Sequence, residues 1–346
     1  MGQYSKIRRL GAGQFGEVWL AFHEGLGVNH AVKYVREEKV TDPTEFFKEP
    51  QLLKKLEHPS IVQVHDAGRT EDGQLFIAME HIPGGSIADR LKGKPLKLRR
   101  LKPVFCEALR GLDFAHTKGF IHRDVKPANI LIGATGYGKL SDFGLATRLN
   151  ARGVASPYGY IAHLAPEVIT TNETSILSDI YATGVTLYRA TNGDSLLPEH
   201  NNSEELQDAI VNGEFPNRTA YRLYVPRALK TLINKAMHVE PAKRFQSADD
   251  LRHALEQTVI QCSWGESATS KGNVWRSETE RRILRIELAY AGDNLWNLET
   301  VRTIKPDGLP RRIKSFCLQR VRRIVAEEAV SRITTASVSG KQLSLA

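Results

Sequence analysis

The chain has 346 residues, of which 41% are hydrophobic and 25% charged, a composition ordinary for a soluble protein that is long enough for more than one domain. No apolar run approaches bilayer length, and three widely spaced cysteines support neither a disulfide framework nor a zinc site, so we expect no membrane segment and a reducing, cytoplasmic compartment. The net charge of +9 is uneven, because residues 271–346 hold 15 Lys and Arg against 8 Asp and Glu, which is +7.

A glycine-rich segment opens the chain. Residues 7–18 predict a strand, a glycine turn and a second strand, and Gly11, Gly13 and Gly16 follow the spacing G-x-G-x-x-G. Glycines here let the backbone close over phosphates, where a Cβ would obstruct it. Dinucleotide-binding folds use a similar pattern but continue into a helix. Residues 19–22 instead continue as strand, which favours a phosphate-covering hairpin.

Four further elements precede the densest motif. We expect a strand over 30–35, a helix starting after the cap Asp42, a strand over 75–79 and an amphipathic helix over 101–118. Pro50 lies inside the first helix, where it removes a backbone bond to Phe46. A tolerated kink and a helix that is not always in place are both compatible with this proline.

The densest cluster of polar motifs lies between residues 119 and 144. Asp124, Lys126 and Asn129 share one loop, and Asp142 begins the triplet Asp-Phe-Gly. The apolar runs 129–132 and 139–140 predict a short hairpin turning at 133–138. That hairpin would bring Asp124 and Asp142 close together at one site.

Phosphoryl transfer needs such a set of side chains. One carboxylate orients the attacking hydroxyl and accepts its proton, a second carboxylate and a carboxamide hold Mg²⁺ on the nucleotide phosphates, and a cation offsets charge on the moving group. Asp124, Asp142, Asn129 and Lys126 fit these roles in that order. Either motif alone is a weak signal, whereas both at this spacing are hard to obtain by chance.

In this arrangement the segment from Tyr4 to Cys262 resembles the protein kinase superfamily, of the serine/threonine type and similar to bacterial kinases of the eukaryotic-like type. The resemblance implies an α+β, bilobal kinase fold with a small β-rich N-lobe at 1–80 and a larger helical C-lobe at 84–262. It also implies ATP and Mg²⁺ as cofactors, a protein as substrate, and autophosphorylation.

The resemblance assigns further residues by position. Lys33 would join Asp124 and Lys126 as a catalytic residue, and it would pair with Glu49. Asn129 and Asp142 would be the metal ligands. In the same way Arg244 would pair with Glu167, and Asp179 would anchor the catalytic loop. The nucleotide-binding positions would be Gly11, Gly13, Phe15, Gly16, Val18, Ala31, Lys33, Glu49, Met79, Glu80, Ile82 and Leu131.

The segment from Gly144 to Ala165 would be the activation loop. A phosphate on Ser156 could pair with Arg123, which makes both candidate regulatory residues. Alternatively Ser156 is never modified, and Tyr158 or a backbone carbonyl holds Arg123. Tyr160 and His163 replace the threonine and tyrosine that the family usually carries here, which puts the substrate platform in doubt.

The last quarter of the chain resembles no family. Residues 263–273 are rich in Ser, Gly and Thr and predict a linker, and 274–346 predict a small basic α+β domain. We expect strands over 281–303, core anchors at Trp275 and Trp296, a turn at Asp307-Gly308, and a helix over 311–333. The arginines favour a solvated or interdomain face over a nucleic-acid site. The alternative is that this domain contacts nucleic acid or a partner protein.

These patterns predict a protein kinase. The alternative is a pseudokinase or nucleotide-binding scaffold that acts through the basic C-terminal domain. The presence of Lys33, Asp124 and Asp142 argues against this alternative, whereas Tyr160 and Pro50 argue weakly for it.

Overall fold

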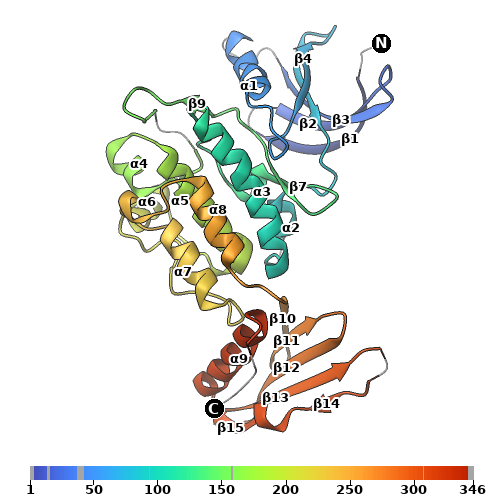
Figure 1. Ribbon diagram of the computed structural model, residues 1–346, viewed down its shortest axis with the longest axis vertical. Helices are drawn as coiled ribbons and strands as arrows, with labels where there is room; N and C mark the ends of the chain where they lie inside the picture. Colours follow the sequence, from blue (N-terminus) through green and yellow to red (C-terminus); the bar gives the residue numbers. More distant parts are fainter. Residues whose placement is uncertain are drawn as a thin grey trace.

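The computed structural model describes residues 4–13, 16–36, 43–92, 94–156, 159–306 and 308–341. A small sheet-rich lobe, a larger helical lobe and a C-terminal sheet with one helix follow each other along the longest axis of the molecule (Figure 1). The first two lobes confirm the expected bilobal α+β fold. Within the described ranges, no helix is long and apolar enough to cross a membrane.

The N-lobe is an antiparallel sheet with one helix beside it. The apolar core of the sheet is formed by alternate residues of neighbouring strands, among them Ala21, Val32 and Ala78, as expected where one face is covered. The helix begins at Pro43, so its predicted cap, Asp42, falls outside the described residues. The elements, with the strands in spatial order, are β1 (Tyr4–Gly13), β2 (Gly16–His23), β3 (Val28–Arg36), β5 (Gln74–Glu80), β4 (Val64–Arg69) and the helix α1 (Pro43–Lys55).

The C-lobe is organised around one helix, α5 (Ile176–Asn192), which is buried on nearly all sides. Ser175 caps its first turn through a reciprocal hydrogen-bond pair with Ser178, which sets where the helix starts. The surrounding helices are α2 (Ile87–Arg90), α3 (Leu98–Thr117), α4 (Pro166–Thr171), α6 (Ser203–Val211), α7 (Arg227–Ala236) and α8 (Ala248–Gln257).

The predicted hairpin at the junction of the lobes is confirmed. Its strands are β7 (Ile130–Ile132) and β8 (Gly138–Leu140). Gly138 allows close approach to α3, because a Cβ at this position would lie 2.0 Å from the Val104 carbonyl oxygen. A second short pair, β6 (Phe120–Ile121) with β9 (Thr147–Arg148), holds the two ends of the motif region together.

The prediction of a linker over residues 263–273 is wrong. The segment forms strand β10 (Trp264–Thr269), a turn and the start of β11 (Gly272–Glu278). Trp264 is 2% exposed and anchors the strand, while the small polar residues that suggested a linker occupy its exposed positions. An edge strand tolerates such residues because only one of its faces is packed.

The prediction of one helix over residues 311–333 is wrong in its first half. Residues 311–312 and 318–322 are strands β14 and β15, and both pair with β13, so the helix α9 begins only at Arg323. Ile324, in the first turn of α9, is 57% exposed. The strands expected over 281–303 are confirmed, and Trp275 is a core anchor with 2% exposure, whereas Trp296 is half-buried. Asp307 of the predicted turn lies outside the described residues. The bounds are β12 (Arg282–Tyr290), β13 (Leu295–Ile304), β14 (Arg311–Arg312), β15 (Leu318–Arg322) and α9 (Arg323–Val338).

The C-terminal segment packs directly on the C-lobe. Helix α9 lies between the C-lobe helices and the C-terminal sheet (Figure 1). The Thr334 hydroxyl donates a hydrogen bond to the Leu223 carbonyl at 3.3 Å. The backbone N–H of Gln261 donates to the Val338 carbonyl at 2.8 Å. One continuous apolar core joins the two parts, running from C-lobe residues such as Leu232 to Trp275 and Ile333.

Candidate active site

Asp179 of α5 fixes the loop that carries the first motif. Its carboxylate accepts hydrogen bonds from the backbone N–H groups of His122 and Arg123, each at 2.8 Å. It also contacts the His116 imidazole at 2.8 Å. Burial alone would raise the pKa of Asp179, but the hydrogen bonds and charge of His116 and the contacts with His122 lower it. The carboxylate therefore stays ionised and holds the loop backbone in place.

Two residues of the motifs have left-handed backbone conformations. Arg123 has φ of 65° and Asp142 has φ of 60°. Side chains other than glycine rarely adopt such values, and they persist where the surrounding contacts impose them. Both residues lie next to or within the predicted catalytic motifs, which is where such conformations concentrate.

Asp124 has two carboxylate oxygens in different environments. Oδ2 accepts hydrogen bonds from Lys126 Nζ at 2.6 Å and from Asn129 Nδ2 at 2.9 Å. Oδ1 is buried and has no hydrogen-bond partner within the described part of the chain. A buried, unpartnered carboxylate oxygen is costly unless a ligand satisfies it. The arrangement can therefore accept a hydrogen bond from a substrate hydroxyl.

Lys33 links the N-lobe sheet to α1 and to the second motif. Its Nζ lies 2.8 Å from Glu49 Oε2 and 3.8 Å from Asp142 Oδ1. Burial alone would lower the pKa of Lys33, but the carboxylates of Glu49 and Asp142 outweigh it and raise the pKa, so the lysine stays cationic. The contact with Glu49 forms although Pro50 lies within α1, so the proline does not keep Glu49 from its partner.

Three of the predicted nucleotide-binding positions, Val18, Ala31 and Met79, share a face of the N-lobe sheet with Lys33. Val18 of β2 lies opposite Lys33 of β3, and Met79 of β5 lies opposite Ala31 of β3. Residues directly opposite each other in a sheet point to the same side. Val18, Ala31 and Met79 are each half-buried, as are Ile82 and Leu131 on the C-lobe side.

Strands β1 and β2 stay paired up to the glycine-rich turn. Gly11 pairs with Val18, and Gly13 pairs with Gly16 directly before the turn. Gly16 has φ of 147°, and a Cβ there would lie 2.1 Å from the Tyr34 carbonyl oxygen. No other residue fits this position without a backbone shift. Phe15 of the same turn lies outside the described residues.

The Glu80 side chain does not line the nucleotide face. Its carboxylate accepts hydrogen bonds from Lys139 Nζ, at 2.6 and 2.8 Å, and from the backbone N–H of Gln63, at 2.9 Å. These bonds tie the end of β5 to β8 and to the residue before β4. Any contact of Glu80 with a nucleotide must come from its backbone. The sequence carries no signal for this pairing, and the same is true of the contact between His116 and Asp179.

The Arg123 guanidinium is held by backbone carbonyls. It donates to the carbonyl oxygens of Leu145 and Ser156, the second at 2.8 Å, while the Ser156 side chain is exposed. Tyr160 is 55% exposed, and its ring lies 5.7 Å from that of buried His163, with the two rings tilted by 39°. Burial, reinforced by the cations Arg189 and Lys126, holds the pKa of His163 well below its ordinary value, so this imidazole is neutral.

The two lobes, the Lys33–Glu49 pair and the Asp124, Asn129 and Asp142 side chains are the defining parts of a protein kinase. The chain belongs to the protein kinase family, since the family model described as "Protein kinase domain" matches residues 4–256.

Named relatives agree with this family. The chain is 34% identical to serine/threonine-protein kinase PknJ of Mycobacterium tuberculosis over 72% of its own length and 44% of that protein. It is 32% identical to PknH of the same species, over 75% of this chain and 42% of PknH. It is also 31% identical to serine/threonine-protein kinase cds1 of Schizosaccharomyces pombe, over 74% and 59%. The chain thus spans less than half the length of the mycobacterial relatives.

Proposed function

We propose that this protein transfers the γ-phosphate of ATP to serine or threonine hydroxyls of protein substrates, and to itself. The observation that carries the proposal is the asymmetry of Asp124, whose Oδ2 is held by Lys126 and Asn129 while Oδ1 is buried and unpartnered. A general base must present one oxygen to the substrate and be oriented through the other. The alternative of a pseudokinase is not favoured, because Lys33, Asp124 and Asp142 lie in a competent arrangement and the relatives bear kinase names.

The residues divide the reaction between them. Asp124 orients the acceptor hydroxyl and takes its proton, and Lys126 beside it offsets charge on the transferred group. Lys33, positioned by Glu49, contacts the nucleotide phosphates. Asn129 and Asp142 would hold Mg²⁺, and their amide and carboxylate oxygens are ligands that this ion prefers. When bound, Mg²⁺ would neutralise charge on the phosphates.

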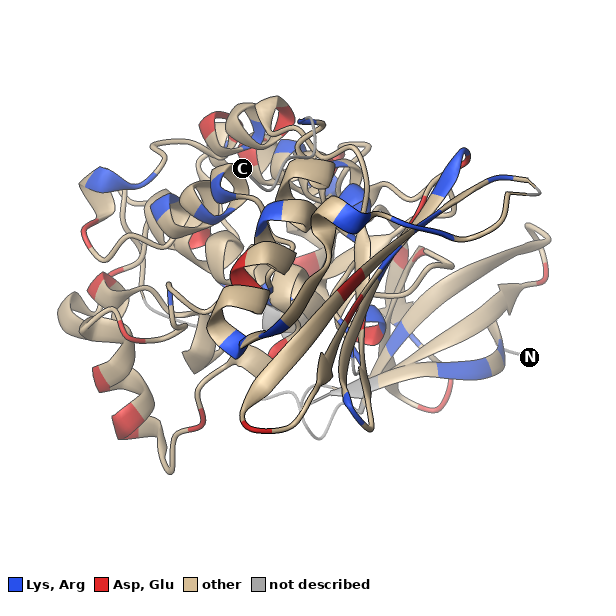
Figure 2. Cartoon of the chain, turned by 90° about the horizontal axis from the view of Figure 1, so that it is seen from below, with Lys and Arg blue, Asp and Glu red and all other residues tan. Residues whose placement is uncertain are grey.

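For the C-terminal segment we propose a structural role rather than nucleic-acid binding. Viewed from below, Lys and Arg and Asp and Glu are interspersed along the strands of the C-terminal sheet (Figure 2). Arginines and glutamates of the sheet form ion pairs, which reduce the positive charge available to a phosphate backbone there. The pairs are Arg276–Glu278, Arg285–Glu287 and Arg312–Glu299.

We further propose that residues 1–262 form the catalytic unit and 263–346 a module docked on it, in a reducing cytoplasm. The free thiols of Cys106, Cys262 and Cys317 support that compartment.

A phosphotransfer assay tests the proposed activity. Purified protein is incubated with γ-labelled ATP and Mg²⁺, alone and with a generic basic protein substrate, and phosphoserine and phosphothreonine are identified by mass spectrometry. We expect label in wild type and none with Asp124→Asn, which keeps the size and most hydrogen bonds of the side chain. Equal labelling of wild type and Asp124→Asn would overturn the enzyme proposal.

A further inference from the structure

A run of cations precedes and begins α3, on the C-lobe. From Lys92 to Lys102, six of 11 residues are Lys or Arg, and no Asp or Glu lies between Arg90 and Cys106. The first 270 residues carry a net charge of +2, so without this run they would carry −4. The cations of the run, which we call the α3 strip, are Lys92, Lys94, Lys97, Arg99, Arg100 and Lys102.

The strip is exposed and largely without carboxylate partners. Lys92 contacts Asp89 at 3.3 Å, but within the described residues no carboxylate lies within ion-pair distance of the other five. Five of the six side chains are exposed, and Lys102 is half-buried. About half of the cations elsewhere in the C-lobe, such as Arg152 and Arg189, have an acidic partner.

Helix stability does not explain these charges. Arg99 and Arg100 lie in the first turn of α3, which has no acidic residue and no side-chain cap. The positive end of the helix dipole disfavours cations in that turn and favours Asp and Glu. A cost accepted at two adjacent positions indicates that the charge serves another purpose.

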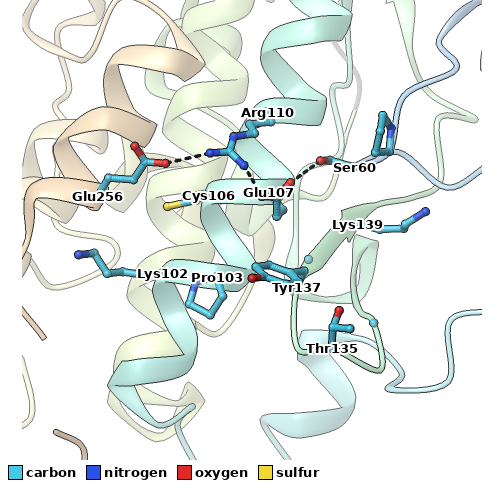
Figure 3. A pocket seen from close by; sticks show the side chains of 13 residues that line it. Ser60, Lys102, Pro103, Cys106, Glu107, Arg110, Thr135, Tyr137, Lys139 and Glu256 are labelled. Atoms are coloured by element: carbon cyan, nitrogen blue, oxygen red, sulfur yellow. Dashed lines mark hydrogen bonds and ion pairs between the residues drawn. The ribbon is translucent and has the colours of Figure 1, made fainter. Parts of the chain in front are cut away.

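The strip leads into a cavity of about 650 Å³. Lys102 lines this cavity, and Arg100 rests on the β7–β8 turn at its rim, where a Cβ on Gly136 would lie 2.6 Å from the Arg100 Nη1. Pro103 and Tyr137 contribute apolar surface, and Tyr137 is 52% exposed (Figure 3). None of the proposed catalytic or nucleotide-binding residues lines it.

The deeper wall of the cavity carries its own charge network. Glu107 accepts from Ser60 Oγ at 2.7 Å and pairs with Arg110, which also reaches Glu256 at 3.3 Å (Figure 3). Burial raises the pKa of the Cys106 thiol to about 11, so the thiol stays neutral. The wall therefore combines ion-paired charges with an aromatic ring beside a cationic entrance.

We propose that the α3 strip and this cavity form a docking site, separate from the active site, for an acidic linear segment of a protein partner. Acidic side chains of the segment would lie along Lys94, Lys97 and Arg100, and an apolar side chain would enter the cavity beside Tyr137. A kinase substrate or regulator that carried such a segment would be held near the active site without occupying it, which raises its effective concentration there.

The composition of the cavity favours a peptide over nucleic acid. Inside the cavity, Arg110 is paired with Glu107 and Glu256, and Lys139 is paired with Glu80. Of the residues that line the cavity, only Lys102 is therefore left to neutralise a phosphate backbone that followed the strip inward. A peptide can change from acidic to apolar residues within a few positions and so match both parts. A nucleic acid carries one negative charge per nucleotide throughout.

Binding of a synthetic peptide tests the docking site. The probe is a fluorescein-labelled peptide of consecutive glutamates ending in leucine, and its affinity is measured by fluorescence anisotropy at low and high salt. The test variant is Lys94→Glu, Lys97→Glu, Arg100→Glu. The control is Lys55→Glu, Arg227→Glu, Lys271→Glu, which changes the net charge equally at exposed cations elsewhere. Matching melting temperatures of both variants establish that they fold.

We expect the test variant to bind the peptide about tenfold or more weakly and the control to bind it like wild type. Tyr137→Ala should weaken the leucine-ended peptide but not an otherwise identical peptide ending in glycine. Phosphorylation of a basic protein substrate that lacks an acidic run should be the same in all variants, which separates this proposal from that of catalysis. An equal loss of peptide affinity in the test and control variants would overturn the proposal of a docking site. So would a single-stranded DNA of equal charge that binds more tightly than the peptide and loses affinity in the test variant, because the strip would then be a nucleic-acid surface.

Discussion

Arg244 and Glu167 lie 77 residues apart in the chain and form a bidentate ion pair, with Nη1–Oε1 and Nη2–Oε2 distances of 2.8 and 2.6 Å. The Arg244 side chain is fully buried and also donates to the carbonyl oxygens of His238, Leu177 and Val239. The pair ties the start of α4, where the activation segment ends, to the loop before α8. It thus fixes one end of the segment that would present the substrate.

Loss of Arg244 should destabilise the fold strongly. Arg244→Ala leaves Glu167 without its buried partner, and we expect the free energy of unfolding to fall by about 3–5 kcal/mol. The matched control is Arg152→Ala, which breaks the exposed pair with Glu173 and should cost less than about 1 kcal/mol. Urea unfolding measures both, and similar losses would contradict a special role for the buried pair.

The two motif aspartates should differ in what their loss removes. Asp124→Asn removes the proton acceptor, so turnover should fall by about a hundred- to ten-thousand-fold while ATP affinity stays near that of wild type. Asp142→Asn should lower Mg²⁺-dependent ATP affinity as well, because it removes a proposed metal ligand. Steady-state kinetics and calorimetric ATP titration separate the two effects. If Asp124→Asn lost ATP affinity as Asp142→Asn does, the division of roles would be wrong.

Replacing Pro50 should affect stability rather than activity. Pro50→Ala restores an N–H inside α1, and we expect unfolding to become harder by roughly 1–3 kcal/mol. Activity should stay level, because the bond between Lys33 and Glu49 is already formed with the proline present. Thermal melting and initial rates are the measurements, and Glu49→Gln, which should slow the reaction, is the control. A rise in activity without a rise in stability would instead assign Pro50 a regulatory role.

Asp179 should make stability depend on acidity. The folded state lowers the pKa of Asp179 below the unfolded value of about 4, so its contribution is complete above that value and is lost as pH falls through the folded pKa. We expect the difference in unfolding free energy between wild type and Asp179→Asn to be constant from about pH 7 to 5 and to shrink below about pH 4. A difference that grew on acidification would show that the pKa is raised instead.

Phosphorylation of Ser156 should raise activity through Arg123. A phosphate there can replace the Ser156 carbonyl as the acceptor for the guanidinium, with a stronger, charge-assisted hydrogen bond. We expect incubation with ATP and Mg²⁺ to phosphorylate Ser156 and to raise the rate. Ser156→Ala should keep the starting rate, because its backbone carbonyl remains, but should not respond. Mass spectrometry that found no phosphate on residues 145–164, with Ser156→Ala as active as wild type, would leave the carbonyl contact as the permanent arrangement.

The sequence predicted the parts of the fold that depend on neighbouring residues. The hairpin after Asn129 follows from two short apolar runs and a glycine turn, and the face shared by Lys33 and Ala31 follows from strand alternation. The linker prediction for residues 263–273 failed because composition does not show that Trp264 becomes buried against distant residues. The prediction for the first half of 311–333 failed for a related reason, since β15 pairs with residues of β13 that lie 20 to 27 positions earlier in the chain. Contacts between side chains of separate helices, such as His116 with Asp179, leave no local pattern.

The apolar core that continues from the C-lobe into α9 has a consequence for how the chain folds. The match to the kinase family model ends at residue 256, yet Cys262, Trp264 and Val338 belong to the same core as the C-lobe helices. A boundary that separates two regions in sequence comparison therefore falls inside a single cooperative unit. The C-lobe and the C-terminal segment should unfold together, and a chain cut after residue 262 would leave an exposed apolar surface that favours aggregation.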